Sequence, residues 1–154
     1  MKLKPNHIVI PSITVLVAIV GSWITQGGME WYKTELIQPG FTPPDWAFPI
    51  AWNIIFILTT ISVLIVWNKK SPRKNLIVTL FGLNAFLNVL WSVLFFGDHL
   101  VFPAFVEMIF LELTLVALIP LIWKVSKAAS LMLLPYLLWV GFATYLTHLI
   151  NVLN

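Results

Sequence analysis

Five long apolar stretches constrain the fold of this sequence more than any other feature. They cover residues 8–26, 46–67, 75–96, 101–123 and 130–153, and Glu107 and Glu112 are the only formal charges inside them. A helix of about 20 residues crosses the ~30 Å apolar core of a bilayer, and it satisfies its backbone polar groups within the segment. The sequence therefore predicts an all-α membrane protein, a five-transmembrane-helix bundle that forms a single domain over residues 1–154.

The charged residues predict how this bundle is oriented. They make up only 10% of the chain, against roughly a quarter in soluble domains, so the exterior is expected to face membrane lipid. Eight of the nine Lys and Arg residues lie near the N-terminus, in residues 68–74 or in residues 124–129, which five spans place on one side. The positive-inside rule then predicts a cytoplasmic N-terminus.

Charge and cysteine content exclude several classes of function. The net charge of +3 is small and scattered, so nucleic acid is not expected as a partner. The chain has no cysteine, which excludes disulfides and thiolate catalysis. No pair of histidines has the spacing of metal ligands, and we expect neither a metal nor a cofactor.

The connection over residues 27–45 is longer than the others and contains Trp31, Tyr32 and Phe41. Loops beyond about 12–15 residues are usually functional or disordered, and this one carries too much apolar surface for a disordered segment. The Gly27-Gly28 pair is expected to end the first helix. The sequence predicts a long ordered loop that forms a lid on the outer face.

Aromatic and amide side chains recur at helical spacing in three of the predicted spans. Residues at i, i+3, i+4 or i+7 share one face of a helix, and such faces are formed by Phe48, Trp52 and Phe56; by Asn84, Asn88 and Trp91; and by Trp139, Phe142, Ala143 and Leu146. Buried amides are expected to point into the bundle. Aromatic walls with a few polar groups are typical of a site for a flat, largely apolar ligand. The alternative is that these faces form only the core of the bundle.

Two carboxylates and three prolines lie within the spans. Glu107 and Glu112 are five residues apart, about 140° around a helix, so they are not expected to form one paired site. Each is a functional candidate, with a structural hydrogen bond as the alternative. Pro11, Pro120 and Pro135 each lack an amide donor and are expected to bend their helices.

A longer set of residues resembles the tryptophan-rich sensory protein and translocator protein (TspO) family. The matching positions are Gly21-Ser22, Trp31-Tyr32, Pro39, Pro43-Pro44, Trp46, Pro49, Trp52, Asn84, Asn88, Trp91, the run Pro135 to Trp139, Phe142 and Thr144. The resemblance covers essentially the whole chain. It implies five helices in a homodimer, with a ligand pocket beneath the first loop, in a bacterial cell membrane.

The resemblance also implies which residues form the site. Trp52 and Trp139 match the tryptophans on which a light- and oxygen-dependent degradation of protoporphyrin IX relies, so they are the candidate catalytic residues. The other candidate ligand-binding residues are Gly21, Ser22, Tyr32, Pro44, Phe48, Asn84, Asn88, Trp91, Phe142 and Ala143.

The implied function is binding of a tetrapyrrole, as a sensor or scavenger, together with binding of isoquinoline and benzodiazepine-type drugs. A carrier of tetrapyrroles or other small apolar molecules is the alternative, although the sequence has no evident internal repeat. A structural role for the aromatic residues is a third reading. Animal members of the family also bind cholesterol, and their proposed cholesterol motif is a tyrosine in the last helix followed shortly by Lys or Arg. Here no basic residue follows Tyr145, so the sequence does not predict cholesterol binding.

Overall fold

The computed structural model describes residues 5–154, and every regular element in that range is helical. The elements are α1 (Asn6–Thr34), α2 (Ala47–Asn68), α3 (Lys74–Ser92), the π-helical turn η1 (Val93–Gly97), α4 (Val101–Trp123), α5 (Lys127–Leu131) and α6 (Leu134–Leu153). They form five spans long and apolar enough to cross a membrane. The predicted five-helix bundle is confirmed. Lys2 and Lys4, the two basic residues near the N-terminus that contribute to the predicted orientation, lie outside the described residues.

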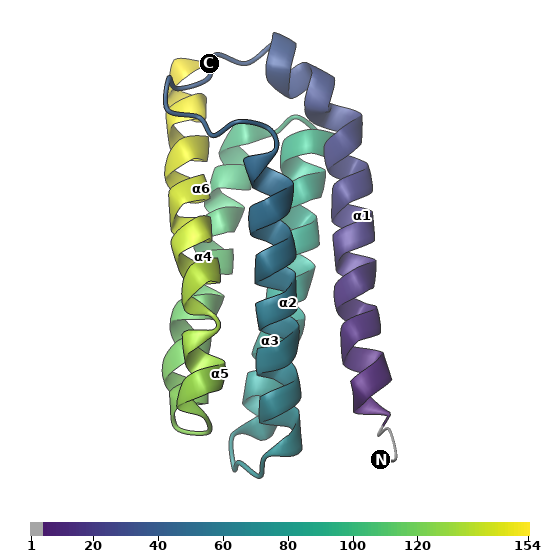
Figure 1. Ribbon diagram of the computed structural model, residues 1–154. Helices are drawn as coiled ribbons and strands as arrows, with labels where there is room; N and C mark the ends of the chain where they lie inside the picture. Colours follow the sequence, from purple (N-terminus) through teal and green to yellow (C-terminus); the bar gives the residue numbers. More distant parts are fainter. Residues whose placement is uncertain (1–4) are drawn as a thin grey trace.

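The five spans run side by side as a bundle, with α3 and α4 behind α2 and α6 in the view of Figure 1. Helix α4 packs against both α3 and α6, while α1 packs against α2, α3 and η1. The N-terminal end of α1 and the connections after α2 and α4 lie at one end of the bundle (Figure 1). The first loop and the C-terminus lie at the other end, which matches the topology that the basic residues predict.

Helix α1 is longer than the sequence predicts, and this corrects the expected helix end at Gly27-Gly28. The helix continues to Thr34, so the loop covers residues 35–46 instead of 27–45. The glycines are tolerated because Gly28 lies directly against the backbone of η1. A Cβ atom on Gly28 would collide with the Phe96 carbonyl oxygen and lie 2.8 Å from the Phe96 Cα. Glycine at this position permits close packing of α1 against η1, and it does not end α1.

The last span is divided near Pro135. Instead of one helix over residues 130–153, the short α5 ends at Leu131 and α6 begins at Leu134. Pro135 therefore lies in the first turn of α6, where its missing amide hydrogen costs no helical bond. The expected bend inside a helix is replaced by a break before it. Pro11 and Pro120 lie within α1 and α4, as predicted.

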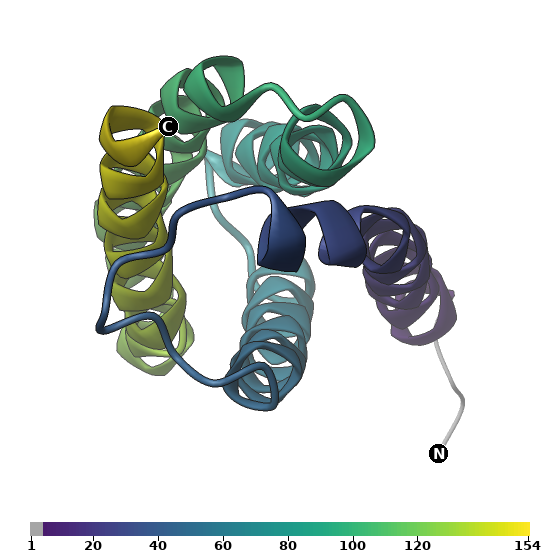
Figure 2. The ribbon, with the colours of Figure 1, turned by 90° about the horizontal axis from the view of Figure 1, so that it is seen from above.

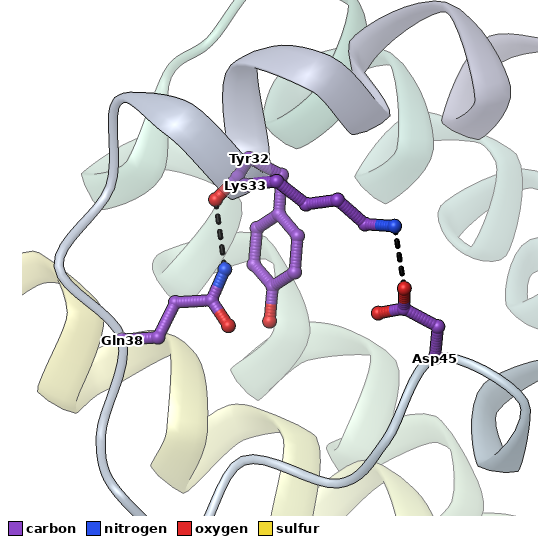
Figure 3. Close-up of polar contacts among 4 residues, drawn as sticks. All are labelled: Tyr32, Lys33, Gln38 and Asp45. Carbon is purple, nitrogen blue, oxygen red and sulfur yellow. Dashed lines mark hydrogen bonds and ion pairs between the residues drawn. The ribbon is translucent and has the colours of Figure 1, made fainter.

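The first loop is ordered by specific bonds and covers the outer end of the bundle (Figure 2). The side-chain amide of Gln38 donates to the Tyr32 carbonyl at 2.8 Å, and Lys33 pairs with Asp45 (Figure 3). The Asn154 side chain accepts a bond from the Ile37 amide at 2.9 Å. These contacts tie the loop to the ends of α1 and α6.

Candidate functional site

The centre of the bundle contains an aromatic cluster between α2 and α6, which we call the α2–α6 cluster. Phe48 and Trp139 meet edge to face across the two helices, with ring centroids 5.8 Å apart. Trp52 meets Tyr136 in the same way at 5.9 Å and stacks on Phe56 at 5.6 Å. Phe48 and Trp52, whose spacing predicts a common face of their helix, both contact α6.

The loop contributes to the outer end of this cluster. Phe142 lies 5.9 Å from Trp139 between ring centroids, and Phe41 of the loop packs against Phe142 at 6.5 Å. Phe41 also stacks on Tyr145 at 6.1 Å. Ala143 packs against the buried core beside Trp139. Pro44 lies in the loop and is exposed.

The two candidate amides are buried beside the cluster and are hydrogen-bonded. Asn84 is 4% exposed and donates to the Thr114 hydroxyl at 2.8 Å. Asn88 is 7% exposed and donates to the Tyr136 hydroxyl at 3.1 Å. Both amides point into the bundle, as the sequence predicts for polar groups within a membrane. Because both amides are held by these hydrogen bonds, they place polar groups at a fixed position beside the aromatic cluster.

Trp91 and Tyr32 belong to a second aromatic group, near the outer end of α3. Trp91 stacks on Phe95 at 5.5 Å and meets Phe96 at 5.6 Å. Tyr32 packs against the same two phenylalanines. The Tyr32 hydroxyl and the Trp91 indole N–H are buried and have no hydrogen-bond partner among the described residues. Trp91 also packs against the core that holds Trp52 and Trp139, so it links the two groups.

The structure places Gly21 and Ser22 apart from the α2–α6 cluster. A Cβ atom on Gly21 would lie 3.5 Å from the Ser92 hydroxyl, so Gly21 faces α3. Ser22 is exposed and accepts a bond from Gln26 at 3.3 Å on the same helix. Their proposed contact with a ligand stays a prediction.

Tyr136 is the residue of this site that the sequence interpretation missed. It is 3% exposed, contacts Trp52 and binds Asn88. Its position three residues before Trp139 places it on the same helix face, which is the signal that identifies it. Thr114, the acceptor of Asn84, lies on a third helix, and no spacing within α3 could indicate it.

Glu107 and Glu112 occupy different environments, in line with their predicted angular separation. Glu107 is 5% exposed, and neither carboxyl oxygen has a partner among the described residues. Glu112 lies against α6, with its Oε1 3.0 Å from the position of a Cβ atom on Gly141. Neither carboxylate belongs to the α2–α6 cluster.

A Tyr136→Phe substitution tests the bond to Asn88. It is expected to leave the Asn88 amide unpaired and to destabilise the protein by about 1 kcal/mol, the usual size of such bonds in membrane proteins. Unfolding by sodium dodecyl sulfate, followed by circular dichroism, measures the change. Tyr145→Phe is the matched control, because Tyr145 is 56% exposed. Equal stability of the two variants would contradict the assignment.

These features define an integral membrane protein with an internal aromatic site, closed by an ordered loop and provided with two fixed amides. Comparison with known proteins places it more narrowly. The sequence model of the TspO/MBR family matches residues 9–153. The chain belongs to the TspO/MBR family and is a multi-pass integral membrane protein.

Individual relatives cover nearly the same length. The chain is 38% identical to the tryptophan-rich protein TspO of Chlorobaculum tepidum, over 92% of this chain and 91% of that protein. It is 35% identical to the tryptophan-rich protein TspO of Archaeoglobus fulgidus, over 94% of this chain and 95% of that protein. It is also 29% identical to the human translocator protein, over 84% of this chain and 78% of that protein.

Proposed function

We propose that this protein binds a tetrapyrrole such as protoporphyrin IX at the α2–α6 cluster. The observation that supports this most directly is the pairing of Phe48 with Trp139 and of Trp52 with Tyr136 across two helices. Ring faces of this kind bind flat apolar molecules, and pockets for such ligands combine apolar walls with a few placed polar groups. Asn84 and Asn88 supply the polar groups.

The same chemistry suits isoquinoline and benzodiazepine-type drugs, which are flat and largely apolar. The homodimer implied by the resemblance stays a prediction, because the structure describes a single chain.

A slow photochemical activity follows from the two tryptophans. Light excites the bound porphyrin, and the indole of Trp52 or Trp139 donates an electron to the excited ring. The reduced ring passes this electron to dioxygen, which becomes superoxide, and the indole radical cation regains an electron from the porphyrin. The oxidised porphyrin then combines with superoxide, so the indole is restored and the net reaction consumes only light, porphyrin and dioxygen. The protein holds the ring against the indoles and limits its motion, which favours reaction in one geometry.

Titration with protoporphyrin IX in the dark tests the binding step. We expect saturable quenching of tryptophan fluorescence, because the porphyrin would lie against Trp52 and Trp139. Asn88→Ala, which removes one polar contact, is expected to weaken binding about fivefold to tenfold. Linear, non-saturating quenching would instead mean that the aromatic residues serve only packing. Isothermal calorimetry in the same detergent provides an independent affinity.

A further inference from the structure

An internal space lies between α1, α2 and α3, in the half of the bundle nearest the N-terminus. Its volume is about 600 Å³, within the range of ligand sites in proteins. Asn84, Asn88 and Tyr136 line its inner end, and through Phe56 and Tyr136 it borders the α2–α6 cluster. Its mouth is bordered by Asn6 and Trp67. We call it the α1 cavity.

The walls of the α1 cavity combine an aliphatic side on α1 with the aromatic rings of Phe56, Trp67, Phe81 and Tyr136. Val9, Ile13 and Val17 line it from α1, and Val63 lines it from α2. The α1 wall from Asn6 to Val17 has a length of ~16 Å at ~1.5 Å per residue. The branched aliphatic side chains along this wall offer a flexible hydrocarbon chain continuous apolar contact over that length.

The α1 cavity is accessible from the bilayer. Val9 and Ile13 line it, yet they are 52% and 51% exposed, so the surface of α1 beside the cavity faces lipid. Gly82 of α3 leaves part of the space open, because a Cβ atom at this position would meet no atom within 4 Å. A molecule dissolved in the adjacent leaflet could enter without crossing the bundle.

A cation lies at the mouth of the α1 cavity. The Lys74 ammonium sits over the Trp67 ring, 4.8 Å from its centroid, and donates to the Trp67 carbonyl at 2.6 Å. The inner end instead holds amide and hydroxyl groups that pair with one another or with Thr114. An anion would be costly to desolvate at the inner end, whereas Lys74 favours it at the mouth. An amphiphile is therefore expected to enter with its chain first.

We propose that the α1 cavity binds one fatty acid, with its hydrocarbon chain between α1, α2 and α3 and its carboxylate at Lys74. A single chain matches a space of this volume, whereas a phospholipid has two chains to accommodate. The inner end of this site adjoins the proposed tetrapyrrole site, because Asn84 and Asn88 border both, but the fatty-acid proposal does not rest on tetrapyrrole binding.

The binding assay uses cis-parinaric acid, a fluorescent unbranched fatty acid, with the protein in nanodiscs of neutral phosphatidylcholine. We expect saturable energy transfer from tryptophan to the probe, because Trp67 borders the mouth. Gly82→Leu fills the cavity and is expected to weaken binding at least about tenfold. Gly27→Leu is the matched control, since a Cβ at Gly27 also meets no atom within 4 Å and Gly27 does not line the cavity.

The position of the carboxylate is tested with the methyl ester of the probe. The ester is expected to bind about fivefold more weakly than the acid, the effect of one lysine on an anion near a membrane surface. Lys74→Gln should weaken binding of the acid by the same factor and leave the ester unchanged. If Gly82→Leu does not fold, Ile13→Trp fills the cavity from the exposed face of α1.

Three results would overturn the proposal. One is unchanged binding in the cavity-filling variant that folds. Another is displacement of the probe by phosphatidylglycerol in the nanodisc as effectively as by added palmitate, which would assign the space to a leaflet phospholipid. The third is equal binding of acid and ester, which would remove the role of Lys74 and so contradict the orientation.

Discussion

Replacing both Trp52 and Trp139 with phenylalanine will abolish the light-dependent loss of protoporphyrin IX while leaving the fold intact. Phenylalanine keeps an aromatic ring against Phe56, Tyr136 and Phe48, the present neighbours of the two indoles. It is, however, a much poorer electron donor than indole. The loss of porphyrin absorbance under illumination in air measures the effect, with dark and oxygen-free samples as blanks. We expect a fall of at least about a hundredfold, equivalent to about 2.7 kcal/mol in the barrier.

The matched control replaces two tryptophans that lie outside the cluster. Trp46 and Trp123 are 66% and 45% exposed at the ends of α2 and α4, where tryptophan is commonly found at the membrane interface. Their double replacement is expected to leave the reaction rate unchanged. Dark titration of both double variants separates lost binding from lost photochemistry. An unaltered rate in the Trp52 and Trp139 variant would refute the proposed role of these residues.

The five helices could be predicted from sequence because membrane spans are specified by length and apolar composition alone. The ends of those helices could not. Gly27 and Gly28 are ordinary helix-breaking signals. Position 28 nevertheless stays helical and must be glycine, because the backbone carbonyl of Phe96, more than sixty residues further along the chain, leaves no room for a side chain. Near Pro135, the break falls before the proline, because the first turn of a helix tolerates it. In both cases a tertiary contact or a backbone constraint determined the boundary.

The candidate site was predictable within helices but not between them. The i, i+4 spacing of Trp52 and Phe56 correctly predicted rings on a common face, and they stack in the structure. Spacing along α3 likewise indicated that Asn84 and Asn88 point inward. It could not identify their partners, Thr114 and Tyr136, because these lie on other helices. Which helices face each other depends on packing of the whole bundle.

The π-helical turn at the end of α3 is another feature that helical spacing in the sequence could not predict. It places Phe95 and Phe96 beside both Trp91 and Tyr32 of α1. Trp91 precedes the turn, so a regular helical projection places it correctly with Asn84 and Asn88 but misplaces the two phenylalanines. The extra residue in a π-helical turn shifts the positions that follow, and no local sequence signal marks it.

Gly28→Ala will destabilise the protein by about 2–3 kcal/mol, the upper part of the usual cost of overpacking. The added methyl group would lie 2.8 Å from both the Cα and the carbonyl carbon of Phe96, which are backbone atoms and cannot rotate away. The outer turns of α1 must therefore separate from η1, and Tyr32 would lose its packing against Phe95 and Phe96.

Sodium dodecyl sulfate unfolding of Gly28→Ala and Gly27→Ala provides the comparison. The two changes add the same methyl group to adjacent residues of one helix, and alanine is the better helix former at both positions. A Cβ at Gly27 meets no atom within 4 Å, so Gly27→Ala is expected to be neutral or stabilising. The difference between the variants thus isolates the contact with Phe96 from helix propensity. Equal stability would mean that α1 and η1 separate without cost, and that the close approach at Gly28 does not hold the outer end of α1 in place.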